Sequence, residues 1–257
     1  MTDARLDAMA RHMWDARRAR TRHANLPDAL KPSSIAEAYL AQDVYHRLAE
    51  PVYGPVGGVK VATTTKVMQE LMGITHPCGG AIFAKTIHAS PARIAKADFV
   101  NVRIESEIAL KIGRDMPLGA TWTAASVVPY VAGAMPAYEL IEDRHAVYTE
   151  SNAVSMIVEN CWNGGVVIGE PKQVSPKDII GVTGRQTLNG KSIGEGKSED
   201  PFATLAWLAN LLAERGRHIA AGMVVITGSL IPTFSVSPGD KAVFTVDGLG
   251  EAVIEIT

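Results

Sequence analysis

The sequence predicts an α+β fold with a helical N-terminal section, residues 1–52, and a β-rich body, residues 53–257. Apolar residues recur with a period near 3.6 before Pro51, which is the period of an amphipathic helix. After Pro51 most segments alternate apolar and polar residues, or form short apolar runs between turn residues, as strands do. The 257 residues suit one large domain with a smaller appendage, and they contain no internal repeat.

Two helices are expected in the N-terminal section. The first covers residues 3–23 and has an apolar stripe formed by Leu6, Met9, Ala10 and Met13. The second begins at Ser34, because Ser34 and Glu37 have the spacing of a capping box, and it runs to about Ala49. Its predicted buried stripe consists of Leu40, Val44 and Leu48.

Strands are expected to dominate the body, with a hairpin turn at Asn189-Gly190 and a second hairpin at the C-terminus. The strand segments lie within residues 57–64, 97–113, 130–139, 161–171, 178–196, 222–229 and 241–256. Helices are expected only from Thr65 to a stop at Gly73, near residues 121–129, and from Asp200-Pro201 to about residue 215.

Composition excludes several classes of function. The formal net charge of -2 gives no electrostatic argument for binding nucleic acid or an acidic membrane. The N-terminus has no signal-peptide pattern, and no apolar run has the length needed to span a bilayer. Two cysteines outside any metal-binding spacing are typical of reduced thiols, so a cytoplasmic location is expected.

Glu105 and Glu107 lie one residue apart in the strand-like segment of residues 102–112. Side chains alternate along a strand, so the two carboxylates share one face, about 7 Å apart at the backbone. They can converge on one cation, or they can be the solvated face of a surface strand. Glu139 is a third carboxylate candidate, but the nearby Glu142 and Asp143 make a surface position equally plausible. Three such carboxylates would suit Mg²⁺ or Mn²⁺.

Three further residues are candidates for chemistry. Lys60 lies between Val59 and Val61, so it either snorkels at a sheet edge or faces a site. Ser229 follows an apolar strand, where it either offers a hydroxyl to an anion or belongs to a plain turn. Cys78 is a small packing residue by default rather than a nucleophile. The chain has no G-x-S-x-G motif and no P-loop.

Several segments nevertheless occur in one characteristic order. They are SIAEAYLAQ, GGVKVATTTKVMQELMG, RIESEIALKIGRDMP, PAYELIEDR, DPFATLAWLANLLAERGRHIAAGMVVITGSL and SPGDKAVFTVDGLGEAVIEI. Together they resemble the 2-hydroxypentadienoate (2-keto-4-pentenoate) hydratases and the related 4-oxalocrotonate decarboxylases of the fumarylacetoacetate hydrolase superfamily. The resemblance runs from about Ser34 to the C-terminus, and its E-x-E strand, A-W-L-A-N helix and T-G-S strand end are specific in combination.

The resemblance implies a β-rich mixed sandwich or roll with a helical N-terminal section. It implies that Glu105, Glu107 and Glu139 bind Mg²⁺ or Mn²⁺, that Lys60 is catalytic, and that Ser229 contacts the substrate. Cys78 is placed with the substrate-binding residues, at a position where the family often carries an acid that takes part in proton transfer. The chain also reads Gly-Val-Lys-Val-Ala-Thr-Thr where the family usually has Gly-Tyr-Lys-x-Gly-Leu-Thr.

The implied activity is that of a metal-dependent lyase in aromatic or related catabolism. The enzyme would add water to a 2-hydroxy-2,4-dienoate or 2-oxo-enoate through a metal-stabilised enolate. The alternatives are a 4-oxalocrotonate-type decarboxylase, an acylpyruvate-type C–C hydrolase, and a non-catalytic β-rich binding protein with a decayed site. A small 2-oxo acid is the expected partner, and the resemblance also implies a homo-oligomer.

Overall fold

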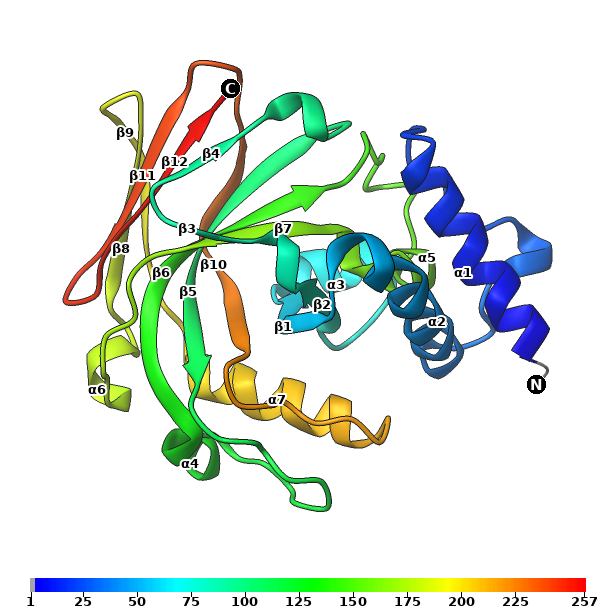
Figure 1. Ribbon diagram of the computed structural model, residues 1–257, viewed down its shortest axis with the longest axis horizontal. Helices are drawn as coiled ribbons and strands as arrows, with labels where there is room; N and C mark the ends of the chain where they lie inside the picture. The colour runs from blue at the N-terminus through cyan, green and yellow to red at the C-terminus, as the bar shows by residue number, and fades with distance from the viewer. Residues whose placement is uncertain (1–2) are drawn as a thin grey trace.

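Two mixed β-sheets form the centre of the molecule in the computed structural model, which describes residues 3–257 (Figure 1). The larger sheet has seven strands in the order β2 (Cys78–Phe83), β1 (Val56–Ala62), β10 (Val224–Ser235), β5 (Val102–Ile112), β6 (Val131–Glu142), β7 (Asn163–Ile168) and β3 (Ile87–Ala89). The smaller sheet has five, in the order β4 (Ala92–Ile94), β12 (Gly250–Ile256), β11 (Lys241–Val246), β8 (Thr183–Leu188) and β9 (Lys191–Lys197).

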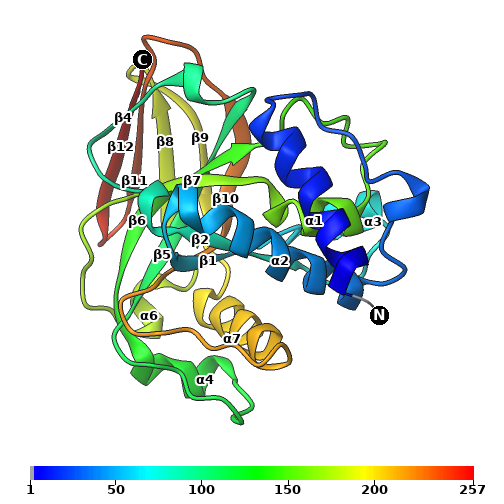
Figure 2. The same ribbon diagram turned by 45° about the vertical axis from the view of Figure 1, so that its right-hand side comes forward.

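The longer helices lie on two sides of these sheets. Helices α1 (Asp3–Arg18) and α2 (Ile35–Tyr53) pack on each other and on α5 (Ala153–Val158), at the end of the molecule away from the smaller sheet (Figures 1 and 2). Helix α7 (Pro201–Ala213) packs on β1 and β10 and contacts α4 (Ala124–Val127). The remaining helical segments are α3 (Lys66–Met72), α6 (Pro176–Ile179), η1 (Asp28–Leu30), η2 (Ala84–Thr86), η3 (Lys96–Asp98), η4 (Val128–Tyr130) and η5 (Asn160–Trp162).

Two large hydrophobic clusters hold these layers together. One joins the two sheets and α7 through buried side chains such as Ile104, Tyr138 and Phe244. The other joins α1 and α2 to α5 and β2, and Met9 and Met156 are among its members. Because this second cluster mixes residues from both sides of residue 52, the N-terminal section packs as part of the body, and the division at residue 52 stays a prediction. Within residues 3–257, no helix has both the length and the apolarity to cross a membrane.

The predicted fold class is confirmed, and local chemistry explains several element boundaries. The Ser34 hydroxyl accepts a hydrogen bond from the Glu37 N–H (3.1 Å) and begins α2. Gly73 has a φ of 70°, a conformation that costs glycine little, and it ends α3. The side chain of Asp200 accepts from two backbone N–H groups at the start of α7.

The structure corrects three expectations about helices. The first helix ends at Arg18, not at residue 23, and α5 was not predicted at all. Leu40, predicted to belong to the buried stripe of α2, is 48% exposed. The buried face of α2 instead passes through small and aromatic side chains, namely Ala38, Tyr39, Ala41, Ala49 and Tyr45. The small residues allow α1 and α5 to approach α2 closely, which the apolar period alone does not indicate.

Cys78 lies outside every predicted strand and helix, but it is the first residue of β2. The sequence Cys-Gly-Gly-Ala-Ile-Phe does not alternate, and only its last two residues favour strands, yet β2 is buried along its whole length. Its glycines are required by packing, because a Cβ on Gly79 would lie 2.7 Å from the Leu211 side chain. A Cβ on Gly80 would lie 2.9 Å from the Asn160 carbonyl oxygen. Tertiary packing therefore decides this strand.

Candidate metal and substrate site

The three glutamates predicted as ligands come together at the centre of the larger sheet. Glu105 and Glu107 lie on one face of β5, and Glu139 of β6 pairs directly with Glu105 across the antiparallel ladder. Each of the three offers a carboxylate oxygen, and these oxygens all lie within 4.8 Å of one another. Glu107 and Glu139 are fully buried, so the surface interpretation of these two residues is wrong.

In each carboxylate, one oxygen accepts a hydrogen bond from the surrounding protein. Glu107 Oε2 accepts a hydrogen bond from the Gly228 N–H (2.7 Å), and Glu105 Oε1 accepts one from the Thr233 hydroxyl (2.5 Å). Glu139 Oε1 accepts from Asn163 Nδ2 (2.9 Å). These contacts fix the orientation of the carboxylates without using all of their oxygens.

Two oxygens at this cluster have no partner among residues 3–257. Glu107 Oε1 and Glu139 Oε2 are buried, and neither accepts a hydrogen bond. A buried carboxylate oxygen without a partner is costly, because it has lost its water and gained nothing in exchange. Hard divalent cations such as Mg²⁺ and Mn²⁺ prefer oxygen ligands of this kind. The residues present therefore fit a divalent cation at this position.

The acidity of the cluster supports the same conclusion. Burial, together with the neighbouring Glu139 and Glu105, raises the pKa of Glu107 well above its usual range. Burial raises the pKa of Glu139 to about 7, with Lys60 opposing the rise and Glu105 adding to it. Three carboxylates this close repel one another when all are ionised, and a bound cation would offset that repulsion.

Lys60 of β1 faces this cluster and is 3% exposed, so the interpretation of a lysine at a solvated edge is wrong. Its Nζ lies 3.0 Å from Glu139 Oε1 and donates to the carbonyl oxygen of Cys161 (3.3 Å). Burial alone would lower the pKa of Lys60, but the carboxylates, Glu139 foremost, raise it, so the side chain is an ammonium ion.

A cavity of about 480 Å³ opens beside Lys60 and Glu105. Ser229 lines it, at a point where β10 departs from regular pairing with β5 around Gly228, whose φ is 110°. The Ser229 hydroxyl donates to the carbonyl oxygen of Ile231 (2.6 Å), so towards the cavity it offers lone pairs rather than its proton. A substrate contact by Ser229 stays a prediction.

Cys78 lies apart from this cavity. It is fully buried at the start of β2 and is not among the residues that line the cavity. Burial raises the pKa of its thiol to about 11, so the sulfur is protonated at neutral pH. This agrees with the packing interpretation of Cys78, while its placement among the substrate-binding residues stays a prediction with no geometric support.

Sequence reasoning missed the aromatic part of the cavity wall. Tyr148 and Trp162 line the cavity and stack with ring centroids 5.3 Å apart. Ile141, Met156, Met68 and Leu230 complete an apolar lining. Trp162 belongs to η5, where three consecutive residues, Asn160, Cys161 and Trp162, have φ between 49° and 57°. The spacing of apolar residues does not predict such a turn, although the Asn-Gly-Gly of the Cys-Trp-Asn-Gly-Gly run is a signal that regular structure is interrupted there.

Comparison with known proteins was consistent across sequence and structure. The model of the family described as "Fumarylacetoacetate (FAA) hydrolase C-terminal" matches residues 62–257. The chain is 26% identical to a 2-keto-4-pentenoate hydratase from Paraburkholderia phymatum over 96% of both chains. It is 27% identical to the TodF product hydratase of Pseudomonas putida over 93% of this chain and 90% of that one.

The solved structure of a 4-oxalocrotonate decarboxylase from Pseudomonas putida G7, complexed with magnesium and adipate, has the same fold. It superposes with a TM-score of 0.90 at 23% identity, covering 100% of this chain and 99% of that one. The observed architecture, two mixed sheets with N-terminal helices, is therefore a known arrangement, and it bears out the predicted β-rich body with a helical N-terminal section.

Proposed function

Because the chain belongs to the fumarylacetoacetate hydrolase family, we propose that it is a divalent-metal-dependent lyase that hydrates a small 2-oxo-enoate. The observation that carries the proposal is the cluster of Glu105, Glu107 and Glu139, with two unpaired buried oxygens, beside a cavity of about 480 Å³. When bound, Mg²⁺ or Mn²⁺ supplies Lewis-acid stabilisation of the negative charge that develops on the 2-oxo group of the substrate.

The protein side chains have distinct roles in this proposal. Glu105, Glu107 and Glu139 hold the cation, and Asn163 keeps Glu139 in its orientation. Lys60 holds a proton at Nζ next to Glu139, and from there the ammonium can donate this proton to a carbon atom of the substrate enolate. Its contact with Glu139 gives the ammonium a counter-charge within the protein.

The cavity wall favours hydration over decarboxylation of a vinylogous diacid. Such a diacid carries a second carboxylate, which needs a counter-charge once it leaves water. Among the described residues that line the cavity, Lys60 is the only Lys, Arg or His, and Glu139 already engages it. The part of the wall formed by Tyr148 and Trp162 suits an uncharged tail instead.

The cavity also favours a hydratase over an acylpyruvate-type hydrolase. Hydrolysis requires a general base for water, and no histidine lines the described cavity. A non-catalytic binding protein would have no need for three clustered carboxylates, two of them fully buried, with a lysine against one of them. A cytoplasmic location and a homo-oligomer complete the proposal, and light scattering on a sizing column tests the oligomer.

The test is a comparison of three substrates with Mg²⁺ or Mn²⁺ present. We expect loss of dienol absorbance with 2-hydroxypenta-2,4-dienoate, and no turnover after metal removal with EDTA. Faster release of CO₂ from a vinylogous 2-oxo diacid would replace hydration by decarboxylation, and cleavage of an acylpyruvate would replace it by hydrolysis. Failure of all three, together with no tight metal binding, would leave the binding-protein alternative.

A further inference from the structure

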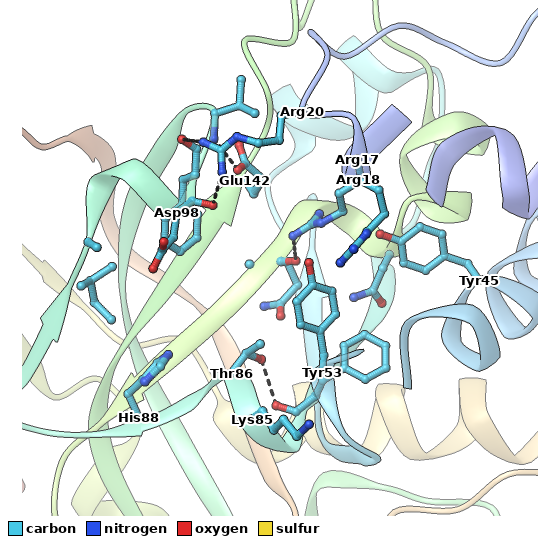
Figure 3. Close-up of a pocket in the computed structure, with 18 of the residues that line it drawn as sticks. Arg17, Arg18, Arg20, Tyr45, Tyr53, Lys85, Thr86, His88, Asp98 and Glu142 are labelled. Carbon is cyan, nitrogen blue, oxygen red and sulfur yellow. Dashed lines mark hydrogen bonds between the residues drawn. The ribbon is translucent and has the colours of Figure 1, made fainter. Parts of the chain in front are cut away.

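A second cavity, of about 560 Å³, lies between the C-terminal end of α1, α2 and the strands β3 and β4 (Figure 3). It shares no lining residue with the cavity beside the metal site. Five cationic side chains line it, Arg17, Arg18, Arg20, Lys85 and Arg93, against the two carboxylates of Asp98 and Glu142. We call it the basic pocket.

The positive charge of the basic pocket is not neutralised by ion pairs. None of its five cationic residues forms a salt bridge to any group in residues 3–257. Glu142 is not free to pair with them fully, because its two oxygens accept the N–H groups of Val100 (2.7 Å) and Asn101 (2.9 Å). Since the whole chain carries a net charge of -2, this surplus is local, and a concave shape concentrates its field.

A buried polar group faces the same space. Arg17 lines the pocket, and its Nη1 is buried and has no hydrogen-bond partner within residues 3–257. Figure 3 shows the Tyr45 hydroxyl turned towards Arg17 and Arg18, with Tyr53 below them and Lys85 and His88 at the lower rim. A buried N–H donor without a partner is costly, so a ligand oxygen that accepts from Arg17 Nη1 is stabilising, and guanidinium groups bind carboxylates and phosphates through paired N–H donors.

We infer that the basic pocket binds a small dianion, a dicarboxylate or a phosphate group, and that its occupancy is linked to the metal site. Arg20 already donates to three backbone carbonyls, so the unpartnered Nη1 of Arg17 and the side chains of Arg18, Lys85 and Arg93 are available to the ligand. Tyr53 and Phe83 provide an aromatic wall for the uncharged part of the ligand.

The linkage follows from two hydrogen bonds through one residue. Arg17 Nη2 donates to the carbonyl oxygen of Asn163 (2.8 Å), and Asn163 Nδ2 donates to Glu139 Oε1 (2.9 Å). The η5 turn before Asn163 also separates the two cavities, because Asn160 lines the basic pocket while Cys161 and Trp162 line the other. An anion that draws on Arg17 therefore shifts the residue that orients Glu139, and by reciprocity the metal changes the affinity for the anion.

Calorimetric titration with inorganic phosphate and with succinate, at ionic strength held constant with KCl, tests the site. The double variant Lys85→Gln/Arg93→Gln removes two exposed pocket cations, and Lys191→Gln/Lys197→Gln makes the same charge change on β9. We expect saturable 1:1 binding to the wild type and the β9 variant, weakened at least 10-fold in the pocket variant. The tighter of the two compounds assigns the class of dianion. Absence of saturable binding by both, or equal affinity of the two variants, would overturn the site.

The linkage has its own measurement, the Kd for Mn²⁺ with and without a saturating concentration of the tighter dianion. We expect a change of at least 2-fold in the wild type and none in the pocket variant. An unchanged Kd in the wild type would overturn the linkage. Light scattering tests the alternative that a second copy of the chain occupies the pocket. If the wild type is an oligomer that binds neither compound, and the pocket variant no longer forms that oligomer, the pocket is a contact between copies and the anion site is wrong.

Discussion

The two cavities are similar in volume, about 480 and 560 Å³, yet they differ in charge and in construction. The proposed metal site, Glu105, Glu107 and Glu139, is anionic and is built by neighbouring strands, β5 and β6, whose register fixes the separation of the carboxylates. The basic pocket is cationic and is assembled from a helix end, a second helix, two short strands and the loops between them. The register of paired strands therefore sets the first site, while the second depends on long side chains that come from separate elements.

This difference has a consequence for how each site tolerates change. In the metal site every carboxylate is held by a specific donor, so removing one group leaves others unpaired. In the basic pocket the charges act together through their field, so one substitution leaves most of the attraction in place. The following predictions test this contrast.

The largest effect is expected from Glu107→Gln. The amide keeps the shape and can still accept from the Gly228 N–H, but it brings no negative charge to the cation. Loss of a residue that merely orients a metal ligand typically costs about 10–100-fold in affinity, so loss of the ligand charge should cost more than about 100-fold. Calorimetry with Mn²⁺ measures the affinity. Wild-type affinity in a folded variant would contradict the ligand role of Glu107.

Lys60→Met is expected to remove turnover while metal remains bound. The substitution takes away a positive charge 3.0 Å from Glu139 and the proton that we assign to catalysis. Loss of a general acid typically costs about 10²–10⁴-fold in rate. The cation continues to balance the carboxylates, so metal content should change little. Steady-state rates with bound metal quantified in parallel give the answer, and full activity would exclude Lys60 from the mechanism.

Asn163→Ala tests the residue that lines the basic pocket and also holds Glu139. It removes the amide that holds Glu139 but keeps the backbone carbonyl that Arg17 contacts. Metal affinity should fall about 10-fold, which is the low end for a residue that orients a ligand. Phosphate or succinate binding in the absence of metal should be unchanged. The opposite pattern, with intact metal affinity and weaker anion binding, would show that the side chain serves the basic pocket.

Cys78→Ser should have a small effect on rate. The thiol is fully buried, protonated and outside the cavity lining, so only packing and the cost of a buried hydroxyl change. We expect a loss of about 1–2 kcal/mol in the free energy of unfolding and a change in rate of no more than about 3-fold. Denaturant unfolding and steady-state kinetics measure the two. Complete loss of turnover with fold and metal retained would give Cys78 the substrate role that the geometry does not support.

The contrast between the cavities also explains what the sequence could predict. Period-two alternation placed Glu105 and Glu107 on one face, but only the resemblance selected binding over solvation, and only the pairing with β6 brings Glu139 opposite Glu105. Lys60 was ambiguous because its burial depends on strands distant in sequence, as β1 pairs in parallel with β10. The basic pocket was not predicted, because its arginines and Lys85 come from segments whose proximity no local pattern records.

His46 provides the smallest effect, one on stability alone, behind the basic pocket. Its Nε2 is 2.8 Å from Asn160 Oδ1, while Nδ1 lies 3.3 Å from Arg217 Nη1, which can only donate. The imidazole is therefore neutral with its proton on Nε2, and burial, aided by Arg217, lowers its pKa to about 3. In the unfolded chain the pKa returns to about 6.5, so below that pH the unfolded state binds the extra proton. The free energy of unfolding then falls with decreasing pH from about 6.5 towards 3.

His46→Gln keeps a donor to Asn160 and removes the titration. With metal saturating, we expect the wild type to lose about 1–2 kcal/mol more than His46→Gln between pH 7 and pH 5, measured by denaturant unfolding. Parallel pH curves for the two proteins would mean that His46 already accepts a proton in the folded state and that its contact with Arg217 breaks when it does.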